Sequence, residues 1–299
     1  MTRYESAIDL DAITAIDVHV HIEIDGHGHA SLPDDLRDAA SKYFSADGPR
    51  PDLDSVAEYY RERSMAAVVF TVDAETQLGH APVSSEEVAE GAARNNDVLI
   101  PFGSVDPRRP DAVDRARRLI DDAGVRGFKF HPTVQGFDPS DEAHFALYEL
   151  LQAEGMVALF HTGQTGIGAG LPGGRGLLLG LSNPILLDPV AARFADLQII
   201  MAHPSVPWQD EALSVATHKH NTWIDLSGWS PKYFPESLVR AANSYLKNRV
   251  LFGSDFPLLT PDRWLRDADP SAGSGTGMFK PEVMPGILKA NAARLLGLG

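Results

Sequence analysis

The sequence contains no cysteine, which excludes disulfide bonds and every metal site built on thiolates. A metal ion in this protein would therefore need nitrogen and oxygen ligands. No apolar run approaches the ~18 residues that a membrane-spanning helix needs. The N-terminal residues carry acids where a secretion signal carries bases and then a long apolar stretch. From these absences we expect a cytoplasmic protein with no membrane partner.

Basic residues are also scarce, with 26 Lys and Arg against 41 Asp and Glu, for a net charge of -15. Such a chain repels phosphate backbones, so we expect no nucleic-acid partner and a small-molecule substrate instead. Hydrophobic residues make up 43% of the 299 residues, which is enough for a sizeable core. We expect a single domain over residues 1–299.

Eight short apolar runs recur along the chain, and most are separated by segments with helical periodicity. The runs span residues 15–20, 66–72, 98–105, 126–132, 156–161, 197–203, 222–227 and 249–256. Helices are expected over residues 85–95, 110–122, 141–153, 208–219, 235–247 and 284–296. Strands that are apolar on both faces and alternate with helices predict an α/β fold, a (β/α)8 TIM barrel. A doubly wound open sheet is the alternative, although no GxGxxG follows the first strand.

Three long segments do not fit simple connections, namely residues 22–52, 162–183 and 266–281. Each follows a predicted strand, so a barrel would place all three on its C-terminal face, where long loops shape substrate pockets. The alternative is that they are plain flexible loops. Four leucines of the second segment suggest a lid over a hydrophobic acyl group: Leu171, Leu177, Leu178 and Leu179.

The first run carries polar side chains inside an apolar strand. Because side chains alternate along a strand, we expect Asp17, His19 and His21 on one face, where two imidazoles can bind one metal ion. The His-x-His pattern alone is weak evidence, because the chain has two more such pairs. We interpret His27 with His29, and His218 with His220, as surface histidines.

Four further polar residues lie in or at the ends of later runs. Lys129 lies in the fourth, and His161, His203 and Asp255 end the fifth, sixth and eighth. In a barrel these strand ends converge on one mouth. Burying so many polar groups without partners would cost ~1–3 kcal/mol each, and a bound cation is a common partner.

The segments IDVHVH, GFKFHP, FHTG, MAHP and FGSDFP, with the C-terminal NAARLLGL, together resemble the amidohydrolase superfamily, specifically its amidohydrolase-related branch. That branch also contains decarboxylases. The resemblance implies that His19, His21 and Asp255 ligate a first divalent metal. It implies that His161 and His203 ligate a second, or that in a one-metal enzyme His161 is a ligand and His203 an acid/base. Lys129 sits where dinuclear members carry a carbamylated lysine, and an ordinary ammonium paired with a carboxylate is the alternative.

The resemblance implies a hydrolase in which a metal-bound hydroxide attacks an acyl carbon of an amide, ester, thioester or lactone. In this mechanism Asp255 accepts the proton of the water and His203 serves as a second catalytic group. Zinc is the favoured metal, with iron and manganese as alternatives, and one or two ions are expected. Asp17, deeper in the strand, is assigned a supporting role.

Two other functions compete with hydrolysis. One is a non-oxidative decarboxylase with a single metal, acting on a phenolic or enoic carboxylic acid. The other is a non-catalytic barrel that binds a metal or ligand as an interaction module. Barrels of this branch are often dimers, so a homodimer is the expected partner, although the sequence shows no clear interface. Four residues are candidate substrate contacts: His131, Trp229, Tyr233 and Arg175.

Overall fold

A computed structural model describes residues 2–45, 50–268 and 278–298. Each of the eight predicted apolar runs contains a strand. The strands are β1 (Ala15–His21), β2 (Met65–Phe70), β3 (Leu99–Pro101), β4 (Gly127–Phe130), β5 (Val157–His161), β6 (Gln198–Ala202), β7 (Thr222–Asp225) and β8 (Val250–Leu251). All pairs of neighbouring strands are parallel and follow the order of the chain.

Two short contacts close the strands into a barrel. Gly103 and Phe128 form a parallel bridge between the β3 and β4 sides, and Val20 and Phe256 form one between the β1 and β8 sides. The N–H of Asp255 also donates to the carbonyl of His19, at 3.0 Å. The predicted (β/α)8 barrel is therefore confirmed.

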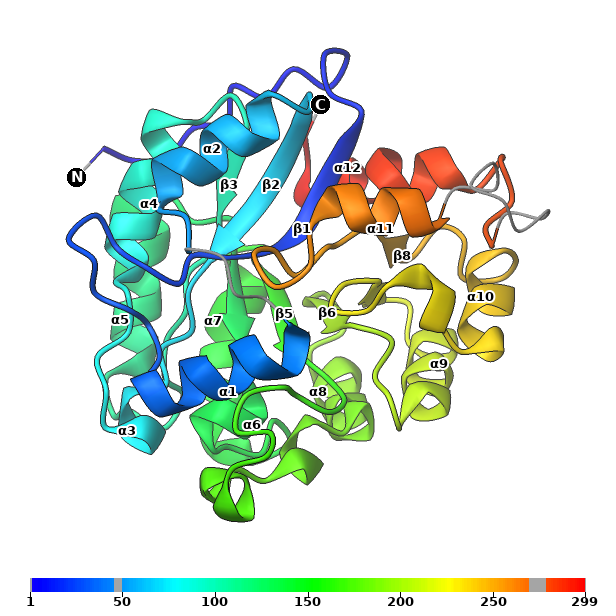
Figure 1. Ribbon diagram of the computed structural model, residues 1–299. Helices are drawn as coiled ribbons and strands as arrows, with labels where there is room; N and C mark the ends of the chain where they lie inside the picture. Colours follow the sequence, from blue (N-terminus) through cyan, green and yellow to red (C-terminus); the bar gives the residue numbers. More distant parts are fainter. Residues whose placement is uncertain (1, 46–49, 269–277, 299) are drawn as a thin grey trace.

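Helices surround the strands, as Figure 1 shows. They are α1 (Asp34–Phe44), α2 (Leu53–Arg61), α3 (Glu75–Leu78), α4 (Ser85–Arg94), α5 (Ala112–Arg118), α6 (Pro132–Gln135), α7 (Phe145–Ala153), α8 (Asp188–Arg193), α9 (Gln209–His218), α10 (Glu236–Ala242), α11 (Pro261–Ala268) and α12 (Asn291–Leu296). All six predicted helices are present. Among the described residues, none of these helices is both long and apolar enough to cross a membrane.

Two of the three long segments differ from simple loops. The segment 22–52 contains α1, and 162–183 contains short 3-10 turns. Part of the third, residues 269–277, lies outside the described residues. The core has two parts: an outer layer between strands and helices, and a plug inside the barrel that includes Val68, Phe70 and Leu159. Each fully buried side chain of this size contributes ~1.5–3 kcal/mol.

The first strand contains an irregularity that the alternation rule misses. Its pairing with β2 shifts register between Asp17 and Val20. The expectation that Asp17 shares a face with His19 and His21 is therefore wrong, because an extra residue in one strand reverses the facing of the residues after it. The Asp17 carboxylate instead accepts hydrogen bonds from the hydroxyls of Tyr60, on α2, and Ser254, at 2.7 and 2.5 Å.

Candidate metal centre

Three ligand atoms form a small triangle where β1 ends and the chain leaves β8. The Nε2 atoms of His19 and His21 are 3.3 Å apart, and Asp255 Oδ1 lies 3.5 Å from the first and 3.3 Å from the second. The His19 side chain is fully buried, that of Asp255 is 9% exposed, and that of His21 is partly exposed, at 18%. Burial alone would raise the pKa of Asp255, but a hydrogen bond from His21 and the nearby imidazoles of His19 and His203 hold it well below its usual range.

The chain bends sharply at two of the predicted site residues. His203, after β6, has φ 69°, and Asp255 has φ 76°. This left-handed region is unfavourable for residues other than glycine, at ~1–3 kcal/mol each. Both residues line the pocket, and such strain clusters at functional sites.

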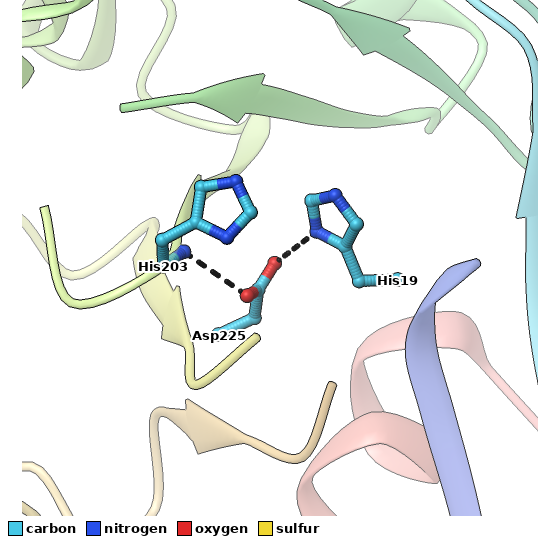
Figure 2. A group of neighbouring side chains, drawn as sticks. All are labelled: His19, His203 and Asp225. Carbon is cyan, nitrogen blue, oxygen red and sulfur yellow. Dashed lines mark hydrogen bonds and ion pairs between the residues drawn. The ribbon is translucent and has the colours of Figure 1, made fainter. Parts of the chain in front are cut away.

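Asp225, at the end of β7, links two of the histidines. Its Oδ2 lies 2.9 Å from Nδ1 of His19, and its Oδ1 accepts the backbone N–H of His203 at 3.1 Å (Figure 2). Oδ1 also accepts the backbone N–H of Ser227, at 3.0 Å, and the Ser227 hydroxyl. Burial would raise the pKa of Asp225, but its contacts with His19 and His203 hold it well below its usual value. Asp225 is thus a buried carboxylate with its oxygens occupied by protein donors.

Asp225 was not among the predicted site residues, because it lies within the apolar run 222–227, which has the pattern of an ordinary buried strand. A weak signal was present, since Asp225 is an acid inside an apolar run, one strand before Asp255. His19, His203 and Asp225 also satisfy the spacing of a metal site. Because the Asp225 oxygens already accept four protein hydrogen bonds, we assign this group to the support of the site. The second group with the spacing of a metal site is His19, His21 and Asp255.

Lys129 reaches the same place from β4. Its Nζ lies 3.0 Å from His19 Nε2 and 4.9 Å from the centre of the Phe70 ring. The side chain is fully buried. Burial lowers the pKa of Lys129 to about 7, against the opposing charges of Asp225 and Asp255. Much of the population therefore carries a neutral amine near neutral pH.

Three histidines form the other side of the site. The rings of His131 and His161 stack with centroids 3.8 Å apart, and His161 Nδ1 lies 2.9 Å from His203 Nε2. Burial lowers the pKa of all three imidazoles, so each is neutral at pH 7. Within the described chain, the buried Nε2 of His161 has no hydrogen-bond partner. An unpartnered, unprotonated imidazole nitrogen is a good ligand for a divalent ion.

These residues fit a divalent metal ion. Four-coordinate zinc holds nitrogen and oxygen ligands at about 2.0–2.2 Å, which places neighbouring ligand atoms about 3.3–3.6 Å apart. The triangle of His19, His21 and Asp255 has edges of 3.3 to 3.5 Å. The other ring nitrogen of His19, Nδ1, forms a hydrogen bond with the Asp225 carboxylate. Metal-binding histidines usually have a hydrogen-bond partner of this kind.

A pocket opens directly above the site, with an empty space of about 770 Å³ out to its mouth. Its floor contains His21, His131, His161, His203 and Asp255. Its wall is mostly apolar and comes from the strand-end loops and α1: Leu32, Ala40, Phe44, Val72, Val134, Ile167, Trp229 and Leu258. The predicted role in shaping a pocket agrees with the position of the segments 22–52 and 162–183, whereas no described residue of 266–281 lines this pocket.

One buried ion pair belongs to the pocket wall. Glu23 lines the pocket, and its Oε2 lies 2.8 Å from Nε of Arg50, without the alignment of a hydrogen bond. Nη2 of Arg50 donates to the Ser41 hydroxyl on α1, at 2.9 Å. Burial raises the pKa of Glu23, and the Arg50 charge opposes this shift. The pair joins the first strand end to α1 beside the metal centre.

The predicted substrate contacts lie in different places. His131 and Trp229 line the pocket, whereas Tyr233 is 60% exposed and lines an adjoining outer groove. The structure does not bring Arg175 to the pocket, because its Nε donates to Asp35 at 2.7 Å, on the outside of α1. Leu171, Leu177 and Leu179 line a neighbouring groove rather than the pocket itself, although the two share lining residues of the Gly-rich loop, and Leu178 is 64% exposed. His27, His29, His218 and His220 are on the surface, as predicted.

Comparison with known proteins agrees with this geometry. The model of the amidohydrolase family matches residues 16–298. An uncharacterized TIM-barrel protein from Bordetella bronchiseptica has a similar structure, with a TM-score of 0.73, 22% identity, and coverage of 95% of this chain and 98% of that one. A probable 2-pyrone-4,6-dicarboxylic acid hydrolase from Acinetobacter baumannii has a TM-score of 0.64 at 14% identity, covering 96% and 100%.

A dihydroxybenzoic acid decarboxylase from a Polaromonas species, solved with bound manganese and 2-nitroresorcinol, has a TM-score of 0.64 at 15% identity. The match covers 96% of this chain and 97% of that one. No curated protein sequence matches the chain. At these identities the structural matches show a shared fold, and the chemistry of each relative remains a statement about that relative.

Proposed function

The chain belongs to the amidohydrolase family, and from this membership and the site geometry we propose that it is a metal-dependent hydrolase of acyl compounds. The observation that carries the proposal is the triangle of His19, His21 and Asp255, whose edges match the spacing of metal ligands. A divalent ion held there would act as a Lewis acid and lower the pKa of a coordinated water toward ~7.

The residues around the triangle supply the remaining functions. The second carboxylate oxygen of Asp255 lies beside Gly228, where it can take a proton. In a site with one ion, His203, which lines the pocket, can take up a proton and pass it to a leaving group. The apolar wall excludes water and suits a substrate with an apolar acyl group, as Trp229 and Phe44 illustrate.

Lys129 favours hydrolysis at a two-ion site. Its amine can lose a proton near neutral pH, and a neutral amine reacts with carbon dioxide to form a carbamic acid, which releases a proton and becomes an anionic carbamate. That product would replace a cation next to His19 with an anion that can bridge two ions, the second held by His161 and His203. Zinc is the expected metal, and the manganese in the Polaromonas relative makes manganese the next candidate.

A second candidate function is decarboxylation of an aromatic or enoic acid at a single ion. The apolar pocket wall, which includes Phe44 and Trp229, favours it because such a wall suits a flat aromatic ring as well as an acyl chain. Here Lys129 would remain an uncarbamylated amine. The two functions differ in the product released.

The test is an assay of zinc- and manganese-loaded protein against apolar esters, thioesters, lactones and amides, and separately against phenolic and enoic carboxylic acids. We expect acid release from at least one acyl class, and its loss in Asp255→Asn. Asp97→Asn, which removes a surface carboxylate paired with Arg61, is the matched control and should retain activity. Release of carbon dioxide alone would replace hydrolysis with decarboxylation, and full activity after metal removal would refute both.

A further inference from the structure

We propose that Asp225 and Ser227 act together as positioning residues that fix the tautomers of His19 and His203. In this arrangement each imidazole carries its proton on Nδ1 and leaves its Nε2 unprotonated. The inference rests on the metal-binding part of the proposed function and is independent of which bond is cleaved. It comes from counting the protons in one hydrogen-bond network.

The count for His19 is direct. Its Nδ1 lies 2.9 Å from Oδ2 of Asp225, and an ionised carboxylate can only accept hydrogen bonds. The proton of neutral His19 therefore sits on Nδ1. Nε2 is left with a lone pair, which accepts a hydrogen bond from Lys129 at 3.0 Å. The same lone pair is the one that a metal ion requires.

The proton position of His203 follows from the hydrogen bonds of the Ser227 hydroxyl. Ser227 has one O–H proton, and it goes to Oδ1 of Asp225, because the carboxylate has none to give. Ser227 Oγ must therefore accept in its second contact, to His203 Nδ1 at 2.8 Å. His203 thus also carries its proton on Nδ1, and its Nε2 is an acceptor.

The tautomer of His203 in turn determines the tautomer of His161. Since His203 Nε2 accepts, His161 Nδ1 must be the donor across their 2.9 Å contact. Neutral His161 then has no proton on Nε2, which is the buried atom without a partner within the described chain. One carboxylate on β7 thereby sets the proton positions of histidines from β1, β5 and β6.

The test begins with the metal-free protein and its histidine side-chain nitrogens. With ¹⁵N-labelled histidine, two-bond ¹H–¹⁵N correlation spectra report which ring nitrogen carries the proton. Signals are assigned by comparison with His19→Gln and His203→Gln. We expect both residues as the Nδ1–H tautomer. Finding either as Nε2–H in the wild-type protein would overturn the proposal.

Asp225→Asn gives a specific expectation for His19. The oxygen of the new amide should stay at the Oδ1 position, where the backbone N–H groups of His203 and Ser227 converge. Its NH2 group then faces Nδ1 of His19, which must become an acceptor and move its proton to Nε2. Zinc affinity, measured by competition with a chelator, should fall about 10- to 100-fold, the usual effect of losing such support.

Ser227→Ala tests the other half separately. It removes the acceptor for Nδ1–H of His203 and leaves the contact of Asp225 with His19 in place. We expect the His203 signals to change while His19 remains Nδ1–H. If Asp225→Asn fails to fold, this variant alone decides the proposal, because unchanged His203 nitrogens would contradict it.

Asp17→Asn is the matched control, since Asp17 is an equally buried carboxylate whose donors are hydroxyl and backbone groups. It should alter stability but leave both tautomers as in the wild type. A tautomer change in this control would assign the effect to general disruption of the core and overturn the specific role of Asp225. Correct tautomers in a protein that binds no zinc would instead refute the proposed function and leave this inference standing.

Discussion

The amine of Lys129 and the Nε2 atom of His19 are 3.0 Å apart inside the barrel, so the lysine uses the lone pair that a metal ion needs. This contact is a hydrogen bond between two buried groups. An ammonium ion at that position repels a cation, whereas a neutral amine or a carbamate does not. Under the proposed function, we therefore expect the protonation of Lys129 to affect metal binding at this site.

Stability of the metal-free protein should depend on Lys129 above pH 7. The pKa of Lys129 is about 7 in the fold and about 10.4 in an unfolded chain. Between these values the unfolded state binds more protons, so the free energy of unfolding should rise with pH. Urea unfolding with chelator at several pH values measures this slope, and Lys129→Met should flatten it.

Lys289→Met is the control for that experiment, because the Lys289 ammonium donates to the carbonyls of Leu10 and Ile13 at 2.8 and 2.9 Å. It should keep the wild-type slope. An unchanged slope in Lys129→Met would mean that Lys129 is not the group that titrates.

Metal content should also depend on Lys129. After equilibration with bicarbonate, we expect two zinc ions per wild-type chain by elemental analysis and about one in Lys129→Ala. Short carboxylic acids such as acetate or propionate should partly restore the second ion, because they can bridge two cations in place of the carbamate. Two ions in Lys129→Ala without added acid would contradict a bridging role.

Gly228 is a position at which adding a single carbon should disable the site. A Cβ there would lie 2.7 Å from Nδ1 of His203 and 3.3 Å from Oδ2 of Asp255, and the backbone φ is +74°. Gly228→Ala should therefore lower metal affinity and turnover at least tenfold. Gly170→Ala is the control, since φ is +77° but a Cβ would meet nothing within 4 Å. Equal losses in both variants would assign the effect to backbone strain.

The ion pair of Glu23 and Arg50 should behave as a buried pair. Arg50→Met leaves the Glu23 charge without its partner and should cost about 3–5 kcal/mol in unfolding free energy. The double variant Glu23→Gln, Arg50→Met should recover much of this loss, because no unpaired charge remains. Chemical denaturation of the four proteins measures the coupling. A fully additive cycle would show that the two side chains do not interact in solution.

Much of the site could be predicted because its residues end apolar runs. His161, His203 and Asp255 each mark the end of such a run, and parallel strands in a barrel must bring those ends together. Asp225 could not be predicted in the same way. Its main partner, His19, is 206 residues away, and no local pattern encodes a hydrogen bond across the barrel.

The fold likewise has elements that the sequence predicts and features that it does not. Buried strands and amphipathic helices have a sequence period, and all of those predicted are present. The bulge in β1 leaves no periodic pattern in the sequence. Strict alternation of side chains along the strand therefore predicts the wrong face for Asp17. Helix α1 was hidden in a segment that looked like a polar loop, because its start at Asp34 has no side-chain cap to mark it.

The left-handed backbone at His203 and Asp255 lowers the stability of the fold at two residues whose side chains are needed for the proposed function. Glycine would relax either turn, so random mutagenesis scored only for heat resistance should enrich glycine there. The selected variants would have higher thermal stability and no catalytic activity. Engineering of a more robust variant should therefore hold these two positions fixed and seek its gains on the outer helices.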